Sequence, residues 1–114
     1  ANPCSTDSTP TSADQEDHVS MSTHAARRLL KMTNNLAMII GIELLTAVQG
    51  LEFRKPLKTS STLAKVITEL RKYVAPLEKD RSLAPDIEKA SLLIRNGKLI
   101  KTAKGVQFPK LDSR

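Results

Sequence analysis

The chain has 114 residues, of which 39% are hydrophobic and 26% charged, so its length fits one ordinary soluble domain and permits a hydrophobic core. Aromatic residues make up only 3% and Trp is absent, which predicts an aliphatic core. The large aromatic side chains that commonly line ligand pockets are also mostly absent. The formal net charge is +6, but neither stacking aromatics nor a recognition motif accompanies the basic residues, so a nucleic-acid partner is not expected.

The cellular context is indicated by a few local features. Cys4 is the only cysteine and has no neighbours at metal-ligand spacing, so the sequence favours a reducing, cytoplasmic compartment. The longest apolar run, residues 36–48, contains Glu43 and is too short to cross a bilayer, so no membrane partner is expected. The start of the chain lacks the basic and apolar regions of a signal peptide. Because it begins at Ala1 and not at Met, we expect the chain to be a piece of a longer protein.

The N-terminal segment, residues 1–12, is rich in Ser, Thr and Pro and is expected to be irregular. Ser12 and Gln15 then have the spacing of a capping box, which predicts that a helix begins here. Three acids would fall in its first turn, where negative charge suits the helix dipole: Asp14, Glu16 and Asp17.

One long helix is predicted over residues 13–49, because this stretch contains no proline and Gly50 is suited to a left-handed terminator. Such a helix would be about 50 Å long, whereas a compact domain of this size is about 35 Å across. Its second half is apolar nearly all round, through Leu36, Met38, Ile39, Ile40, Ile42, Leu44, Leu45 and Val48. A helix of this kind is usually surrounded on every side, so the sequence predicts neighbours supplied by other chains or by an absent part of this one.

A second, amphipathic helix is predicted after the loop at Pro56. Thr59, Ser60 or Ser61 could cap its start, and Pro76 ends it.

A third helix is predicted to open at Pro85, a residue suited to the first helical position, and to stop at the pair Asn96, Gly97. The helical part of the chain would then span residues 13–96. Residues 97–114 form a basic tail without clear periodicity, which we expect to be extended or mobile. The predicted fold class is all-α, with one long helix and two shorter amphipathic ones.

Residues suited to metal binding or catalysis are few. His18 and His24 would point to different helix faces, and Asp14 with His18 gives only two ligands, so no metal is expected. No spacing specifies a catalytic triad, and the isolated glycines do not form a phosphate-binding loop. For residues 15–18, the sequence alone favours a capping box at the start of a helix. The alternative is that a carboxylate there acts as a base or polar anchor, which would require the helix to be buried in a pocket.

Several stretches of the sequence are similar to one enzyme family. Residues 2–21, NPCSTDSTPTSADQEDHVSM, resemble the start of the C-terminal region of the histidine ammonia-lyases, where a loop leads into a Gln, Glu, Asp, His, Val, Ser, Met motif. The likeness continues through AARRLL, IELLTAVQGLEF, PLKTS and, at residues 80–90, DRSLAPDIEKA. It covers about residues 2–95.

The resemblance implies a carbon–nitrogen lyase that eliminates ammonia from L-histidine to give trans-urocanate, the first step of histidine degradation. In that family the electrophile is a methylidene-imidazolone group made autocatalytically from an internal Ala-Ser-Gly triplet, and no metal is needed. The resemblance also implies a mostly helical homotetramer in which long helices form a central bundle and several subunits build each active site. The rest of the lyase chain and the tetramer partners would supply the neighbours that the long helix lacks.

The resemblance assigns one residue to catalysis. Glu16 matches the acidic residue of the family motif, where the related phenylalanine ammonia-lyases look to have an amide. This implies that Glu16 recognises the imidazole or amino group of the substrate or takes part in proton transfer, with residues 1–12 as an active-site loop. Tyr73, the only tyrosine, is interpreted as a core-edge residue and not as the catalytic tyrosine of the family.

The sequence also departs from the family, because it contains no Ser-Gly dipeptide from which the cofactor could form. We therefore expect a C-terminal fragment, inactive by itself, that contributes bundle helices and the Glu16 carboxylate to a lyase. The alternative is a non-catalytic helical interaction or oligomerisation module derived from that family.

Overall fold

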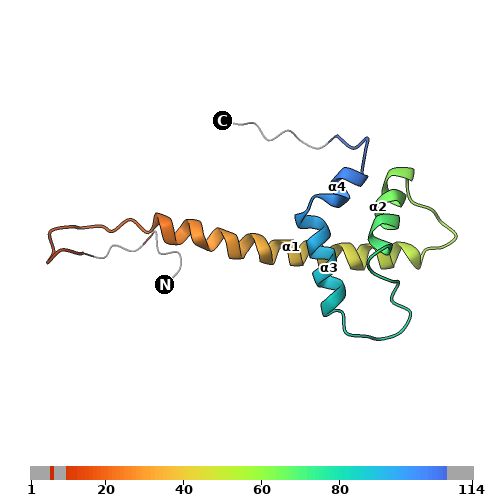
Figure 1. Cartoon of the computed structure of the whole chain (residues 1–114), viewed down its shortest axis with the longest axis horizontal. Helices are drawn as coiled ribbons and strands as arrows, with labels where there is room; N and C mark the ends of the chain where they lie inside the picture. Colours follow the sequence, from red (N-terminus) through yellow and green to blue (C-terminus); the bar gives the residue numbers. More distant parts are fainter. Residues whose placement is uncertain (1–5, 7–9, 108–114) are drawn as a thin grey trace. The chain divides into compact units, whose positions relative to one another are not determined.

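The structure is a computed structural model that describes residue 6 and residues 10–107. Within this part of the chain lie four helices, α1 (Ser22–Glu52), α2 (Ser61–Arg71), α3 (Ala84–Arg95) and α4 (Lys98–Thr102), and no strand beyond one isolated bridge (Figure 1). The predicted all-α class is therefore confirmed for these residues. The chain divides into two compact units, Ala1–Leu36 and Ala37–Arg114.

The first unit shows that the predicted start of the long helix was wrong. Residues 12–14 have φ values of 54°, 57° and 65°, in the left-handed region, so they cannot belong to a right-handed α-helix. Instead, Thr11 and Glu16 form an antiparallel bridge across a tight turn. Helix α1 begins at Ser22, nine residues after the predicted start at residue 13, and its first turn contains no acidic residue.

The end of α1 also differs from the prediction. The helix continues past Gly50 to Glu52, and Gly50 does not have a positive φ. The backbone N–H of Phe53 still donates to the carbonyl of Gln49, which is the helical pattern. Gly50 is thus an ordinary interior position of α1 and does not terminate it.

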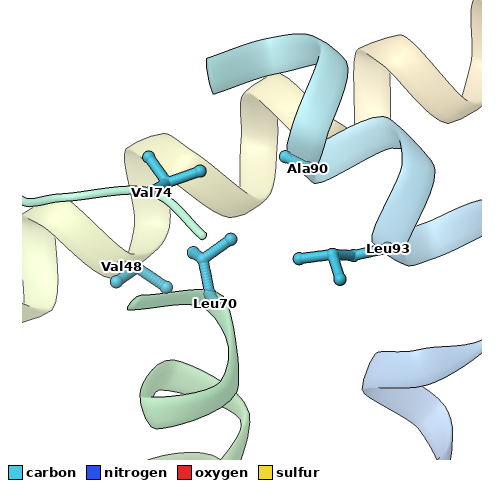
Figure 2. Packing of buried hydrophobic residues seen from close by; sticks show 5 residues of the cluster. All are labelled: Val48, Leu70, Val74, Ala90 and Leu93. Carbon is cyan, nitrogen blue, oxygen red and sulfur yellow. The ribbon is translucent and has the colours of Figure 1, made fainter. Parts of the chain in front are cut away.

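The second unit has a small aliphatic core, as the composition predicted. Val48 from α1, Leu70 from α2, Val74 from the following loop, and Ala90 and Leu93 from α3 form one buried cluster (Figure 2). Four half-buried residues pack against it: Leu44, Leu45, Ile67 and Leu99. Burial of these side chains is the main force that holds the three longer helices together in this unit.

Helices α1 and α3 approach closely at Gly41. A Cβ atom placed on this glycine would lie 3.1 Å from the backbone nitrogen of Ser91 and 3.5 Å from the Cβ of Ala90. Two small residues, Gly41 and Ala90, therefore allow the backbones to meet at this crossing.

Helices α2 and α3 form where local signals predicted them. The Ser60 hydroxyl accepts a hydrogen bond from the N–H of Leu63 at 3.3 Å, which selects Ser60 among the three candidate caps. A proline lies in the first turn of α3, and Gly97, with φ 62°, follows its C-cap Asn96. Helix α3 ends at Arg95, beside the predicted stop at Asn96 and Gly97, whereas α2 ends at Arg71, before the predicted stop at Pro76.

The predicted extended tail is wrong for residues 98–102, which form α4. This short helix contacts both α2 and α3, Leu99 packs against the core cluster, and Ala103 is buried. Tertiary contacts therefore order a segment that is too short to be a stable helix alone. Residues 103–107 of the predicted tail contain no helix, and residues 108–114 lie outside the described part, as do residues 1–5 and 7–9 of the predicted loop.

Helix α1 leaves much of its apolar surface uncovered. Its large exposed side chains are Leu29, Leu30, Met32, Leu36, Met38, Ile39, Ile40, Ile42 and Leu51. By length and composition α1 would also be able to cross a membrane, a property shared with helices buried inside large soluble proteins. Among the described residues, most of the apolar side chains predicted to need neighbours are exposed, whereas Leu44, Leu45 and Val48 pack into the core of the second unit.

Candidate functional site

The turn at residues 11–16 positions Glu16. The backbone N–H of Thr11 donates to the carbonyl of Glu16 at 3.1 Å, and the N–H of Glu16 donates to the carbonyl of Thr11 at 3.2 Å. The Thr11 hydroxyl also donates to Oε2 of Glu16 at 3.1 Å. Backbone and carboxylate of Glu16 are therefore both fixed by one neighbour, although the residue is exposed.

This geometry limits what Glu16 can do within the chain alone. An ionised carboxylate has about four acceptor positions, so the single bond from Thr11 leaves capacity for an imidazole or ammonium donor. A carboxylate surrounded by water is, however, a weak base and a weak electrostatic partner. Glu16 would need burial by other polypeptide before it could act strongly on a substrate.

The neighbours of Glu16 do not have the roles that the capping-box interpretation gave them. Asp14 and Asp17 lie outside α1, so neither can stabilise its dipole from the first turn. Gln15 donates its backbone N–H to the carbonyl of Ser12 within the turn. Among residue 6 and residues 10–107, no group of three or more His, Cys, Asp or Glu residues could hold a metal ion.

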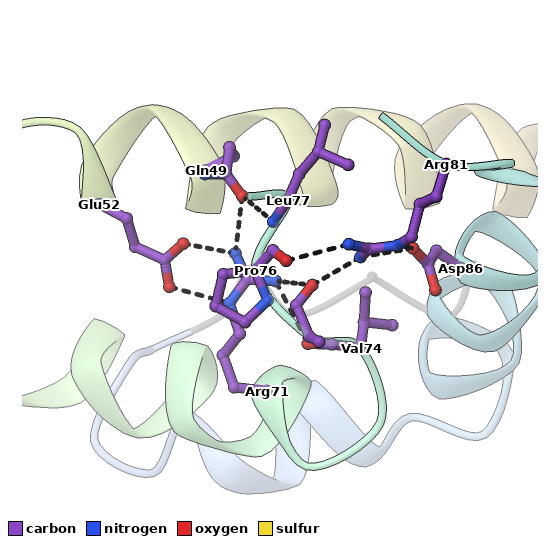
Figure 3. Close-up of polar contacts among 9 residues, drawn as sticks. Gln49, Glu52, Arg71, Val74, Pro76, Leu77, Arg81 and Asp86 are labelled. Carbon is purple, nitrogen blue, oxygen red and sulfur yellow. Dashed lines mark hydrogen bonds and ion pairs between the residues drawn. The ribbon is translucent and has the colours of Figure 1, made fainter. Parts of the chain in front are cut away.

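In the second unit, Arg71 joins α2 to α1 (Figure 3). Its Nε and Nη2 donate to the two carboxylate oxygens of Glu52 at 2.8 and 2.7 Å, a bidentate ion pair whose side chains are 15% and 20% exposed. The hydrogen bonds from Arg71 hold the pKa of Glu52 below its ordinary value, against the opposing effect of partial burial. The Nη1 of Arg71 also donates to the carbonyls of Val74 and Ala75, both at 3.3 Å.

A second guanidinium, that of Arg81 within the same loop, ties the loop to α3. Arg81 donates to Oδ2 of the buried Asp86 at 3.0 and 2.9 Å, and to the carbonyls of Ala75 and Pro76 at 2.8 and 3.0 Å (Figure 3). The loop between α2 and α3, residues 72–83, is therefore tied to both helices by charge-assisted hydrogen bonds.

A third polar cluster attaches α4 to α2. Glu69 accepts from Lys72 at 2.6 Å and from Lys98 at 3.1 Å, and Lys98 also donates a short hydrogen bond to the Tyr73 hydroxyl. The bonds from Lys72 and Lys98 lower the pKa of Glu69, and those to Tyr73 and Glu69 raise the pKa of Lys98. Lys98 is thus a protonated structural cation and not an amine nucleophile. Tyr73 is 40% exposed, and neither the core cluster nor the residues that pack against it include it, so its predicted place at the edge of the core stays a prediction.

A cavity of about 310 Å³ opens between α1, the 72–83 loop and the start of α3. Its lining is mostly aliphatic and includes Ile42, Leu45, Phe53, Val74, Leu83 and Ile87. Sequence reasoning predicted neither this cavity nor the arginine contacts around it. Arg71 and Glu52 lie 19 residues apart on different helices, so no local pattern could have paired them.

Comparisons with known proteins agree with one another. The family described as aromatic amino acid lyase matches residues 1–72. The histidine ammonia-lyases of Bartonella quintana (strain Toulouse) and Roseobacter denitrificans are 57% and 58% identical to this chain, over 98% and 87% of its length. The crystal structure of histidine ammonia-lyase from Trypanosoma cruzi matches 99% of the chain at 39% identity, with a TM-score of 0.82.

The matched proteins are much longer than this chain. It covers 22% of the Bartonella quintana protein, 19% of the Roseobacter denitrificans protein and 25% of the Trypanosoma cruzi structure. The chain therefore spans about a fifth of the length of the curated relatives that it matches.

Proposed function

Since this chain belongs to the aromatic amino acid lyase family, we propose that it is the C-terminal part of a histidine ammonia-lyase, which eliminates ammonia from L-histidine to give trans-urocanate. One observation carries the proposal: identity of 57% to a protein named histidine ammonia-lyase extends over 98% of the chain. The reaction would be the first step of histidine degradation, in the cytoplasm.

Glu16 is the residue that we propose for direct contact with the substrate. Its carboxylate would accept a hydrogen bond from the imidazole or amino group of histidine, or take part in proton transfer. The Thr11 hydroxyl, 3.1 Å from Oε2, would keep the carboxylate in one orientation during this contact. The loop before it, residues 1–12, would line the same active site.

The rest of the lyase would have to supply the electrophile. In this family it is a methylidene-imidazolone group, which makes the substrate amino group a better leaving group. The described residues do not provide such a group, and the sequence contains no Ser-Gly dipeptide from which it could form. We therefore propose that the 114 residues are inactive alone. That no metal takes part is proposed from the family resemblance.

We propose that the uncovered surface of α1 is buried by the rest of the lyase chain and by partners in a homotetramer. Exposed residues such as Leu30 and Ile39 support this, because apolar side chains in such number are normally covered by protein. Burial of the 11–16 turn by the same partners would remove water from Glu16 and strengthen its interactions. Neither nucleic acid nor a membrane is required as a partner.

The role of Glu16 can be tested in a full-length lyase that carries this segment. Glu16→Ala and Glu16→Gln should each lower histidine turnover by about 10²–10⁴-fold, because a positioned acid–base or polar group is lost. The tetramer and the cofactor absorbance should stay intact. Asp14→Asn is the matched control, since Asn tolerates the left-handed conformation of this turn position and should leave turnover unchanged. Unfolding, with normal specific activity in the surviving protein, would assign Glu16 a structural role.

The alternative function is a non-catalytic helical interaction module derived from the family. The missing Ser-Gly dipeptide and the exposed α1 surface are also compatible with this alternative. The reading frame upstream of this segment separates the two. An Ala-Ser-Gly triplet within a much longer chain supports the enzyme, whereas a complete gene product without it would leave only the interaction module.

A further inference from the structure

The cavity between α1, the 72–83 loop and α3, which we call the α1 socket, has a largely apolar lining, and most of its polar groups are already paired. Arg71 is paired with Glu52, and Arg81 with Asp86. The side-chain oxygen of Gln49 accepts from the N–H of Leu77 at 2.9 Å, and the Thr46 hydroxyl donates to the carbonyl of Ile42 at 2.9 Å. The amide nitrogen of Gln49 and Oδ1 of Asp86 keep some bonding capacity, but the rest of the lining would strip a charged occupant of its hydration. The socket therefore favours a neutral, largely apolar group.

The size of the socket also restricts its occupant. About 310 Å³ is at the lower limit of the small-molecule sites found in proteins, and it would hold one or two large apolar side chains. The surface around its mouth is apolar as well: Phe53 is 77% exposed, Ile42 46% and Leu83 43%. A small molecule inside the socket would leave these side chains in water, whereas a polypeptide segment lying across the mouth would cover them.

The source of that segment follows from the length of the chain, and this step depends on the proposed function. The 114 residues cover only 22% of the Bartonella quintana lyase, so most of the polypeptide that would surround them lies elsewhere in the longer protein. We propose that the α1 socket receives a bulky apolar side chain from a segment of the lyase polypeptide outside these 114 residues, and that this side chain is an anchor of the interface between the two parts.

The proposal can be tested by binding between two separately produced parts of a lyase. One part is this chain; the other is the Bartonella quintana histidine ammonia-lyase without the segment that matches it. Thr46→Phe would fill the socket from α1, and the affinity should fall by about tenfold or more because the anchor is excluded. Gly50→Leu fills it from a second position where an added Cβ meets no atom within 4 Å. Affinity would be measured by titration calorimetry, and helix content by circular dichroism.

Thr68→Phe is the matched control. Thr68 is an exposed threonine of α2 whose hydroxyl donates to the carbonyl four residues earlier, as that of Thr46 does, but it lies outside the socket. This variant should bind within about twofold of the original chain, as is usual for substitutions outside an anchor site. If Thr46→Phe loses helix content, Gly50→Leu decides the outcome.

The outcomes separate the socket from the proposed function. If the original chain and all three variants bind equally well, the socket is not an anchor site, although the two parts belong together. If filling the socket abolishes self-association of the chain and leaves binding to the second part unchanged, the occupant is a second copy and the proposal is wrong. If the original chain does not bind the second part at all, the proposed function itself fails, and the socket proposal fails with it.

Discussion

Two glycines of α1 show how differently one residue type is used within one helix. Gly41 lies at the crossing with α3, where an added Cβ would be 3.1 Å from the backbone of Ser91. Gly50 has no atom within 4 Å of the same position and a helical conformation. The first glycine is required by packing, whereas the second meets no neighbour among the described residues and carries the entropic penalty of glycine in a helix.

This contrast predicts opposite effects for the same substitution. Gly50→Ala should raise the free energy of unfolding by about 0.5–1 kcal/mol, because alanine restricts the unfolded chain and favours the helix. Gly41→Ala should lower it by about 1–3 kcal/mol, because α1 and α3 must separate to admit the methyl group. Urea denaturation followed by circular dichroism measures both. A stabilising Gly41→Ala would show that the helices do not meet as described.

At the scale of elements, local sequence signals predicted α2 and α3 well, because a cap at Ser60 and a proline near the start of α3 act within a single turn. The start of α1 was missed because residues 12–14 adopt left-handed conformations that Ser and Ala rarely signal. Helix α4 was missed because its order depends on contacts with α2 and α3. Glu16 was proposed as a site residue from family resemblance alone, whereas the arginine contacts required the structure.

The ion pair between α1 and α2 predicts a dependence of stability on pH. The pKa of Glu52 is lowered in the folded chain, so its stabilising contribution is present at neutral pH and is lost as the pH falls through the lowered pKa. Glu52→Gln should therefore lower stability at pH 7 and reduce the loss of stability between about pH 5 and pH 2.

Urea denaturation midpoints across this pH range check that expectation. Glu88→Gln, which changes an exposed carboxylate of α3, serves as the control and should keep the pH profile of the original chain. Identical profiles for Glu52→Gln and the original chain would show that the Arg71 pair does not stabilise the fold.

At the scale of the whole molecule, the chain buries a small core and exposes many apolar residues. The fully buried large side chains of the described part are limited to Leu70, whereas Leu30 of α1 is 72% exposed. Lysine at such exposed positions would be expected to improve solubility if the chain were a self-sufficient domain. The pattern instead fits a segment that is completed by other polypeptide.

The isolated chain should therefore self-associate. Replacing Leu30 and Ile39 by Lys should shift sedimentation toward the monomer, because both are exposed apolar residues of α1. Leu63→Lys, at a 50% exposed position of α2, should change it less. A monomeric original chain would contradict this expectation.

The loop held by Arg71 and Arg81 has a consequence for the speed of assembly. Because its carbonyls already accept hydrogen bonds from two guanidinium groups, this wall of the α1 socket needs no ordering when a partner segment arrives. Association at this wall should then proceed as the docking of a formed surface, with a rate constant of about 10⁵–10⁷ M⁻¹s⁻¹ and no slow folding phase. Replacing either arginine would leave the loop less ordered before binding, so association would include an additional, slower loop-ordering step.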